Sequence, residues 1–454
     1  MSELIIAGGG ISGLATAWFL HRRGIEVTLL EGQEEVGGLI RSSLFQDYLL
    51  EHGPNSTLQK PGDATDALGR LVDDLGLAAR LLVADSRAAR RYVYRQRRLQ
   101  PLPASPPQFL RSGLFSWRAK WRLLREPFIA RGDGHESIGA FVTRRLGAEF
   151  LDYAVEPFVS GVYAGDPWRL SVAAALPRIH ALEREHGSLI RGAMALGRLR
   201  KTTGLPAGRL VTFDAGMELL PRTIAEKLPA DALRTGTRVT ALEPMKAGGW
   251  RVTWQRGDTT GHDGAPRVIL SLPAPEAAQL VAPFSPAAAE ILRSIAYAPI
   301  VSLGMGWLRD RIGHPLDGFG FLVPRREGMR TLGALFSSTL FPRRAPPGRA
   351  LLTAFIGGAT DPGAATEADH LLSDQVGQDL SRSLDIQGAP EFVHMTRHSR
   401  AIPQYAMDHL EKLQSLEIAM APFPGLHFRA NWRDGISVAD CIRNAEALAT
   451  QIVA

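Results

Sequence analysis

The 454-residue sequence has a single cysteine, Cys441, and this scarcity limits what the chain can be. One thiol excludes an internal disulfide and any metal cluster held by several cysteines, and it favours a reducing compartment. The only conspicuous charge-free apolar run is Leu4–Leu20, and Glu3 precedes it where a signal peptide would carry lysine or arginine. Because no run has the length and polarity of a membrane-spanning helix, we expect any membrane contact to be peripheral. We also expect no metal site.

The composition is otherwise that of a folded protein, with 45% hydrophobic and 22% charged residues. The chain is too long for one ordinary core, so two or three domains are expected. The formal net charge of +6 suits nucleic acid, an acidic membrane surface or an anionic substrate. The excess is local, since arginines are concentrated between Arg87 and Arg131 and alternate there with leucine and tryptophan. We therefore expect a membrane surface or an anionic substrate as the partner, and no nucleic acid.

A glycine-rich stretch near the N-terminus predicts a dinucleotide cradle. Leu4–Ala7 is a short apolar run typical of a buried strand, and Gly8, Gly10 and Gly13 follow it at the GxGxxG spacing. The first glycine permits a tight turn, the second lets the backbone approach a pyrophosphate, and the third lets the helix pack on the strand. Glu31 ends the second strand, about twenty residues further on, where a carboxylate accepts the hydroxyls of an unphosphorylated ribose. This predicts FAD or NAD rather than NADP.

Two further loops favour FAD over NAD. Gly37 and Gly38 have no side chain to keep a loop away from a cofactor, and Arg41 can reach a phosphate or the edge of a bound ring. The segment Glu51–Ser56 contains a glycine-proline turn that can present backbone groups to a flat ligand. An NAD-dependent dehydrogenase does not need these loops.

The succession GxGxxG, Glu31, Val-Gly-Gly and Glu-x-Gly-Pro resembles the flavin-dependent amine oxidase superfamily, in which these stretches line FAD. The resemblance implies FAD as the cofactor and places the backbone of Val239 beside the adenine. A strand, turn and helix near Gly435 would direct another helix N-terminus at the flavin. Arg429-Ala430 departs from the family pattern of that turn. The residues expected at the cofactor are Gly8, Gly10, Ile11, Ser12, Gly13, Glu31, Gly37, Gly38, Leu39, Arg41, Gly53, Pro54, Asn55, Ser56, Val239, Asn431, Ser437 and Val438.

The segment Glu156–Ser171 is rich in glycine and proline, which predicts an irregular loop. This segment closely resembles a signature of the protoporphyrinogen oxidase family, since its sequence is Glu-Pro-Phe-Val-Ser-Gly-Val-Tyr-Ala-Gly-Asp-Pro-Trp-Arg-Leu-Ser. Further stretches resemble the same family, at 314–324, 331–342 and 401–405. The resemblance implies oxidation of protoporphyrinogen in haem biosynthesis, with six electrons passing through FAD to molecular oxygen in three steps. Two alternatives stay open: oxidation of coproporphyrinogen, and a non-catalytic lipid-binding escort protein on the same scaffold.

The resemblance also indicates which residues contact the tetrapyrrole. Arg91 aligns with an arginine near a substrate propionate, and its two-pronged donor geometry suits a carboxylate. Leu322 and Phe336 match apolar residues that sandwich the macrocycle, and Gly161 can offer its backbone to the pyrrole nitrogens. The competing interpretations are a solvated surface arginine and ordinary core packing. No catalytic acid or base is expected, since the twelve histidines are scattered without a pairing pattern.

The expected fold class is α/β, with a Rossmann-like FAD-binding domain built from discontinuous segments, an α+β substrate domain and a helical membrane-associating insertion. The expected boundaries are 1–80, 211–290 and 399–454 for the FAD-binding parts, 81–210 for the helical region that also forms a substrate channel, and 291–398 for the substrate domain. A small sheet is expected from Leu233–Leu242, Trp250–Trp254 and Val268–Pro273. An antiparallel sheet with one face over the flavin is expected from Ile300–Trp307, Gly320–Val323, Thr331–Phe336 and Leu351–Ile356.

The stretch Phe109–Ala130 is basic and amphipathic, with Trp and Leu opposite Arg. It suits the surface of an anionic membrane, and equally a helix packed on the core with its arginines in solvent. The expected location is the cytoplasm, with peripheral association at the cytoplasmic face of the inner membrane. A homodimer and hand-over of product to a ferrochelatase stay open. Cys441 is expected to pack in a buried helix turn.

Overall fold

The computed structural model describes residues 3–63, 65–203 and 208–454, and its first sheet is five-stranded with the order β10-β2-β1-β14-β20. Every neighbouring pair is parallel. The strands are β1 (Leu4–Ala7), β2 (Val27–Leu30), β10 (Leu233–Arg234), β14 (Arg267–Leu270) and β20 (Leu426–Phe428). Three distant parts of the chain therefore build one sheet, which confirms a Rossmann-like domain of discontinuous segments. The strand expected at Val268–Pro273 was assigned to the wrong sheet, since it pairs with β1.

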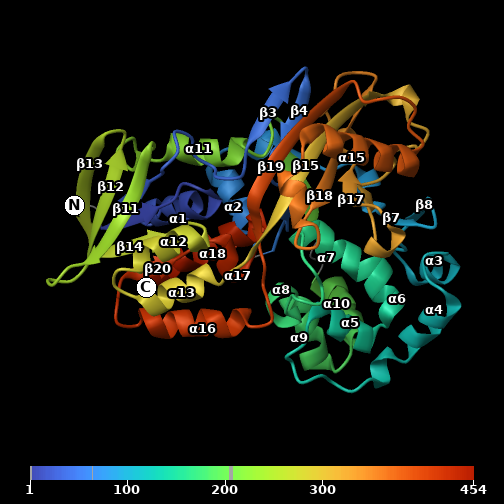
Figure 1. Ribbon diagram of the computed structural model, residues 1–454. Helices are drawn as coiled ribbons and strands as arrows, with labels where there is room; N and C mark the ends of the chain where they lie inside the picture. The colour runs from blue at the N-terminus through green and yellow to red at the C-terminus, as the bar shows by residue number, and fades with distance from the viewer. Residues whose placement is uncertain (1–2, 64, 204–207) are drawn as a thin grey trace.

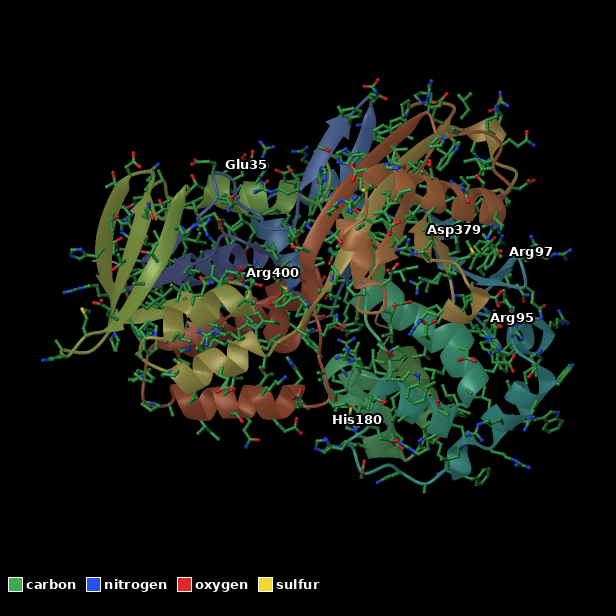
Figure 2. All side chains as sticks on the ribbon, viewed as in Figure 1. Glu35, Arg95, Arg97, His180, Asp379 and Arg400 are labelled. Carbon is green, nitrogen blue, oxygen red and sulfur yellow. The ribbon has the colours of Figure 1, made fainter. Side chains whose placement is uncertain are left out.

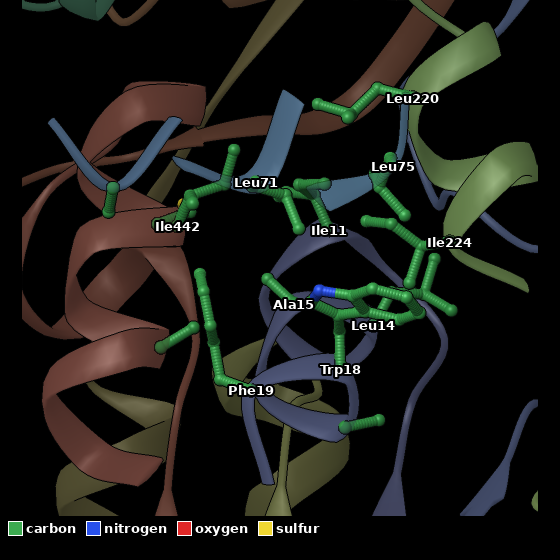
Figure 3. Packing of buried hydrophobic residues seen from close by; sticks show 14 of the residues in the cluster. Ile11, Leu14, Ala15, Trp18, Phe19, Leu71, Leu75, Leu220, Ile224 and Ile442 are labelled. Carbon is green, nitrogen blue, oxygen red and sulfur yellow. The ribbon is translucent and has the colours of Figure 1, made fainter. Parts of the chain in front are cut away.

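Helices cover both faces of this sheet because its strands carry apolar side chains on both faces. Leu4 points into one core and Ile5 into the other. The first core is formed with α1 (Ile11–His21), α2 (Ala67–Asp74), α11 (Leu219–Lys227) and α18 (Val438–Val453). Figure 3 shows this core, with Trp18 of α1 beside Ile224 of α11. The second core is formed with α12 (Ala274–Val281), α13 (Pro286–Arg293) and α16 (His409–Met420).

A three-stranded antiparallel sheet flanks the second core. It consists of β11 (Thr237–Pro244), β12 (Trp250–Arg256) and β13 (Thr259–Ala265). The single strand expected at Leu233–Leu242 is divided, because Gly236 turns the chain with a φ of 60° between β10 and β11. The strand β13 was not expected, since its glycines and aspartate do not resemble a strand.

A seven-stranded sheet forms a second large wall, with the order β19-β15-β18-β17-β16-β7-β8. Its strands are β7 (Tyr92–Arg95), β8 (Arg98–Pro101), β15 (Tyr297–Leu308), β16 (Gly320–Leu322), β17 (Thr331–Leu335), β18 (Arg349–Gly357) and β19 (Phe392–Pro403). The four strands expected here are present, and their mutual pairings are antiparallel. One pair, β7 with β16, is parallel and joins the arginine-rich region to the substrate sheet. Helix α15 (Asp369–Leu384) packs on one face.

The helical region lies beside this sheet, in teal and green in Figure 1. Its helices are α3 (Pro106–Arg111), α4 (Trp117–Leu124), α5 (Ile138–Arg145), α6 (Ala148–Phe150), α7 (Glu156–Tyr163), α8 (Val172–Ala175), α9 (Pro177–His186) and α10 (Leu189–Thr203). The amphipathic stretch after Phe109 forms two short helices, α3 and α4, instead of one. None of the helices in the described part of the chain is long and apolar enough to cross a membrane.

The prediction of an irregular loop at Glu156–Ser171 was wrong in its first half. Residues Leu151–Val155 form a π-helical turn that leads directly into α7. Pro157 is compatible with this helix because it lies in the first turn, where a missing N–H costs little. The helix ends where Ala164 adopts a left-handed conformation with a φ of 47°.

The remaining strands belong to two small sheets near the N-terminal segments. Strands β3 (Ser42–Phe45) and β4 (Tyr48–Glu51) form a hairpin. Strands β5 (Thr57–Gln59), β6 (Leu81–Val83) and β9 (Arg209–Phe213) form a three-stranded sheet. Two one-turn helices complete the fold, α14 (Ser337–Leu340) and α17 (Asn431–Asp434).

Candidate active site

The turn between β1 and α1 has the geometry of a pyrophosphate cradle. A Cβ atom on Gly8 would lie 2.4 Å from the Ser271 carbonyl oxygen, and one on Gly13 would lie 2.0 Å from the Gly8 carbonyl oxygen. These two glycines are required by the protein's own packing. A Cβ atom on Gly10 would meet no atom within 4 Å, so Gly10 borders open space at the N-terminus of α1. Of these three glycines, Gly10 is therefore the one whose lack of a side chain is not required by packing within the protein. This is expected where a ligand approaches the backbone.

Glu31 follows β2 and lies directly against this cradle. Its Oε2 accepts a hydrogen bond of 2.6 Å from the Gly9 amide, and its Oε1 accepts one of 2.7 Å from the Gln33 amide. The amide of Thr237, at the start of β11, donates to the Glu31 carbonyl oxygen at 2.7 Å. This places Val239 two residues along the same strand, beside an irregularity in its pairing with β12.

The double-glycine loop lies on the cradle. Gly37 donates to the Gly9 carbonyl oxygen at 2.8 Å, and a Cβ atom on Gly38 would lie 3.5 Å from the Cα atom of Gly10. Leu39 exposes its side chain, and its carbonyl oxygen lies 2.1 Å from the place where Gly53 would carry a Cβ atom. Pro54, Asn55 and Ser56 directly follow Gly53 in the chain, so this segment begins at the contact with Leu39.

Arg41 is held by acidic neighbours within these loops. Its Nη1 donates to Glu35 Oε2 at 2.6 Å, its Nη2 donates to the Glu35 carbonyl oxygen at 2.9 Å, and Glu218 lies 3.7 Å away. Contact with a cofactor phosphate would require Arg41 to leave Glu35, whose side chain is largely exposed.

A fourth segment reaches the cradle from the C-terminal end of the chain. Ser437 caps α18 by accepting a hydrogen bond of 3.1 Å from the Asp440 amide, and Val438 is buried beneath it. The Cys441 thiol donates to the Gly435 carbonyl oxygen at 3.6 Å, and α1 and α18 pack together in the first core. Burial raises the pKa of this thiol to about 11, which agrees with the packing role expected for Cys441.

The turn at Asn431 is held by two side chains that local sequence patterns do not indicate. The Tyr405 hydroxyl donates to the Asn431 carbonyl oxygen at 2.5 Å and accepts from the Gly435 amide at 2.7 Å. Arg429, which departs from the family pattern, is buried and forms an ion pair with Asp434. The departure therefore adds an ion pair that spans the turn, and Tyr405 fixes both ends of it.

A buried polar cluster supports the Glu-x-Gly-Pro loop, and no local motif indicates this cluster. Glu51 pairs with Arg344 at 2.6 Å and also accepts from the Met217 amide at 2.9 Å. The His52 ring bonds Ser43 and Thr396, and His398 Nε2 lies 2.6 Å from the His52 carbonyl oxygen. These partners are up to 346 residues apart in the chain, so spacing along the sequence could not reveal them.

Burial and two neighbouring histidines, His394 and His398, lower the pKa of His52. Burial also lowers the pKa of His394. Among the described residues, no group of three or more His, Cys, Asp or Glu side chains is arranged to hold a metal ion.

Leu322 and Gly161 meet on one side of the seven-stranded sheet, and Arg91 directly precedes β7 of the same sheet. Side chains alternate along strands, and Tyr92 and Phe321, which are register partners, both point into the core beneath α15. Leu322 therefore projects from the opposite face, toward the helical region. There the Leu322 Cδ2 atom lies 2.7 Å from the place where Gly161 of α7 would carry a Cβ atom.

This face is open and has a cation without a counter-ion. The Arg91 guanidinium lies 5.2 Å from the Phe319 ring centroid, and no carboxylate among the described residues pairs with it. Phe158 and Val162 of α7 are exposed one turn apart, on the side of the helix that contains Gly161. The arrangement offers an apolar surface with one free guanidinium.

Phe336 is not part of this surface. Its side chain is 0% exposed and lies in the core, with its ring centroid 5.5 Å from His314 and 6.3 Å from Phe321. This position favours the core-packing interpretation for Phe336.

Glu156, at the start of α7, is the one strongly perturbed carboxyl group next to this surface. Its Oε2 accepts a hydrogen bond of 3.2 Å from the Arg325 amide, while its Oε1 is buried without a partner. Burial raises the pKa of Glu156 from 4.5 to about 7. Sequence reasoning did not single out this residue, because a glutamate before proline carries no local sign of burial.

We expect Glu156→Gln to remove a pH dependence of stability. Because the folded-state pKa lies above the unfolded-state value, the stabilisation is full below about pH 4.5 and is lost as the pH rises through about 7. The loss in the wild type amounts to about 3 kcal/mol at most. Urea unfolding between pH 5 and 8 should show this slope in the wild type and in the exposed control Glu185→Gln. An unchanged slope in Glu156→Gln would contradict the assignment.

The comparisons with known proteins agree with this geometry. Residues 11–453 match the family described as flavin containing amine oxidoreductase. The chain is 31% identical to chloroplastic protoporphyrinogen oxidase 1 of Spinacia oleracea, covering 99% of this chain and 84% of that protein. It is 28% identical to coproporphyrinogen III oxidase of Bacillus subtilis (strain 168), covering 98% and 96%. A crystal structure of a protein provisionally named protoporphyrinogen oxidase, from Exiguobacterium sp. 255-15, superimposes with a TM-score of 0.82 at 24% identity, covering 99% and 98%.

The family match and the site specify the same cofactor. The family contains a flavin, and the cradle with Glu31 fits a dinucleotide whose ribose is not phosphorylated. The open space at Gly10, in contact with the double-glycine loop, fits such a group without a change in the backbone. The cofactor is therefore FAD, and the chain belongs to the flavin containing amine oxidoreductase family.

Proposed function

We propose that the protein oxidises protoporphyrinogen IX to protoporphyrin IX, with molecular oxygen as the final acceptor. When bound, FAD accepts two electrons at a time, so removal of six electrons needs three rounds. The observation that carries the proposal is the approach of Leu322 to Gly161 on an apolar surface, with the unpaired guanidinium of Arg91 at the start of a strand of the same sheet. The names of the relatives, plant protoporphyrinogen oxidases and bacterial coproporphyrinogen III oxidases, support a tetrapyrrole substrate.

Each part of the chain has a distinct task in this proposal. The amides at the start of α1 bind the pyrophosphate, and Glu31 binds the ribose. Arg91 binds a propionate carboxylate, while Leu322 and Gly161 contact the macrocycle and exclude water from it. The remaining residues expected at the cofactor line the same cradle, with Val239 at the adenine end. We retain the division at residues 80, 210, 290 and 398 as the proposed domain boundaries.

The arginine contacts favour two substrate carboxylates over the larger number in coproporphyrinogen. Arg87, Arg90 and Arg95 are paired with Asp85, Asp317 and Glu149, respectively. Figure 2 shows Arg95 and Arg97 at the β7–β8 hairpin, where Arg97 forms the turn. Arg91, directly before β7, has no carboxylate partner among the described residues and is the arginine that we assign to a substrate carboxylate.

Two measurements test the function. The purified protein should show flavin absorption bands, and a colourless protein would favour the non-catalytic escort alternative. Steady-state kinetics should then give a higher kcat/KM for protoporphyrinogen IX than for coproporphyrinogen III. Equal or greater efficiency on coproporphyrinogen III would overturn the choice of substrate.

Arg91→Ala is expected to weaken substrate binding and leave the flavin content unchanged. A hydrogen-bonded ion pair of this kind contributes about 1.5–3 kcal/mol, so the KM should rise about tenfold to a hundredfold. The control is Arg98→Ala, an exposed arginine on the adjacent strand β8. An unchanged KM in Arg91→Ala would exclude the propionate role, and loss of flavin would indicate a structural one.

We also propose that α3 and α4 associate with the surface of an anionic membrane, at the cytoplasmic face of the inner membrane. Trp117, Trp121 and Phe128 are 65%, 67% and 83% exposed, so these large apolar side chains do not pack on the core. Arginines such as Arg118 and Arg125 lie between them on the surface. This combination is typical of helices that lie at a lipid interface.

The double variant Trp117→Ala/Trp121→Ala is expected to bind anionic vesicles at least about tenfold more weakly, because two exposed indoles no longer enter the interface. Binding by the wild type should also weaken as salt is raised. Co-sedimentation with vesicles containing phosphatidylglycerol measures both effects. The control Ile418→Ala removes an exposed apolar residue from α16 and should bind like the wild type. Absence of wild-type binding at low salt would contradict the membrane proposal.

A further inference from the structure

A pocket of about 620 Å³ lies between the end of α3 and the start of α4. It is lined by Leu110, Arg111, Ser112, Gly113, Phe115, Ser116, Trp117 and Lys120. The only charged side chains in this lining are two cations, Arg111 and Lys120. Figure 1 shows α3 and α4 at the outer edge of the helical region, away from the five-stranded sheet.

Lys120 is a buried cation without a carboxylate partner. Its side chain is 6% exposed, and its Nζ donates to the carbonyl oxygens of Leu110 at 2.9 Å and Ser112 at 2.8 Å. The Nζ atom also lies 4.6 Å from the ring centroid of Trp117. An ammonium group has three donors, so these two carbonyls leave one unused. None of the ion pairs among the described residues includes Lys120, and burying a charge without a counter-ion is costly.

The acidic group that binds the pocket residue Ser116 is already occupied. Glu149 accepts hydrogen bonds from the amide and hydroxyl of Ser116, at 2.9 and 2.5 Å, and pairs with Arg95 at 2.9 Å. The pocket therefore keeps a positive charge. Its rim is apolar, since Leu110 and Trp117 are both more than half exposed.

We propose that this pocket binds the phosphate group of an anionic phospholipid, with Lys120 at its floor and Arg111 at its rim. The phosphate would supply the counter-ion and accept the unused donor of Lys120, and an acyl chain would lie along Leu110 and Trp117. This inference rests on the proposed association of α3 and α4 with a membrane. It adds a defined lipid-binding site to a surface that would otherwise attract anionic lipid only through diffuse charge.

The probe is dihexanoyl-phosphatidylglycerol below its micelle concentration, titrated into the FAD-loaded full chain by calorimetry. We expect one saturable site, whose affinity falls at least about tenfold in Lys120→Met and Arg111→Met. Lys120→Arg should retain most of the affinity, and the exposed control Arg118→Met should bind like the wild type. Arg111 is exposed, so its variant tests the site even if Lys120→Met loosens α3.

Three results would overturn the site: no saturable binding by the wild type, binding by both pocket variants that is as tight as that of the wild type, or equally tight binding of zwitterionic dihexanoyl-phosphatidylcholine by the wild type. Complete displacement by inorganic phosphate at the same concentration would show a free-phosphate site and also overturn the lipid assignment. The proposed function fails separately, because vesicle binding, flavin content and porphyrinogen oxidation are measured on the same preparations. Loss of the lipid site with these three retained would reject only the pocket.

Discussion

Gly10→Val is expected to give a folded protein without flavin. A Cβ atom at this position meets nothing within 4 Å in the protein, so the fold itself has room for a side chain. The same space is where a pyrophosphate approaches the first turn of α1, and valine would occupy it. We expect the affinity for FAD to fall by about a hundredfold or more, equivalent to about 2.7 kcal/mol or more.

Flavin absorbance, circular dichroism and the unfolding midpoint distinguish this effect from misfolding. Gly197→Ala in α10 is the matched control, since Gly197 also borders open space but lies far along the chain from the cradle. Gly13→Val should behave differently from Gly10→Val, because its side chain would collide with the Gly8 carbonyl oxygen and damage the fold. Normal flavin content in Gly10→Val would contradict the assignment of the cradle.

The parallel sheet and its cradle were predictable because their signals are local. Leu4–Ala7, the three glycines and Glu31 lie within about thirty residues and follow one required order. Pairing between distant strands was less predictable. Val268 was expected in the small sheet, but its apolar run is buried on both faces and pairs with β1 and β20. A run of this kind indicates a buried strand and not the sheet to which it belongs.

Helix α7 was not predicted because proline and glycine were taken as helix breakers without regard to their positions in the helix. Pro157 occupies the first turn, where it is tolerated, and the preceding π-helical turn continues the chain into α7. Gly161 lies inside the helix, where a Cβ atom would come within 2.7 Å of the terminal methyl of Leu322. The glycine therefore reflects a close approach between helix and sheet, which depends on tertiary contacts.

The residues that support the site could not be found from spacing. Tyr405 was noted only as part of a family motif, and its contacts with Asn431 and Gly435 depend on how β19 ends beside the C-terminal turn. The histidines around His52 appeared scattered because strand β19 contributes two of them from more than 340 residues away. Local patterns thus predicted the segments that contain the proposed cofactor residues, and only the fold revealed which side chains hold these segments in place.

The largest expected loss of stability follows from Arg145→Met, in the helical region that contains α7. Arg145 is 0% exposed and donates to Glu183 Oε1 at 2.6 Å, to Glu126 Oε1 at 3.2 Å and to the Ile129 carbonyl oxygen at 3.1 Å. Removing it leaves the buried Glu126 carboxylate without a cation, while Glu183 keeps Arg144 at 2.9 Å, and the loss costs about 3–5 kcal/mol. Arg145→Lys should not restore stability, because an ammonium group cannot donate in the same fork geometry.

Urea unfolding measures the loss of stability, and hydrogen exchange should locate it in α9 and α10. Glu183 of α9 binds Arg145 of α5, and Glu126 accepts a hydrogen bond from the Leu189 amide at the start of α10. The control Arg349→Met breaks an exposed pair with Glu391 at 2.9 Å and should cost far less stability than Arg145→Met. Because α7 forms one side of the proposed substrate surface, Arg145→Met should also raise the KM while flavin absorbance persists. A loss of less than about 1 kcal/mol would show that Glu126 and Glu183 find other partners, and the ion cluster would then not be what stabilises this region.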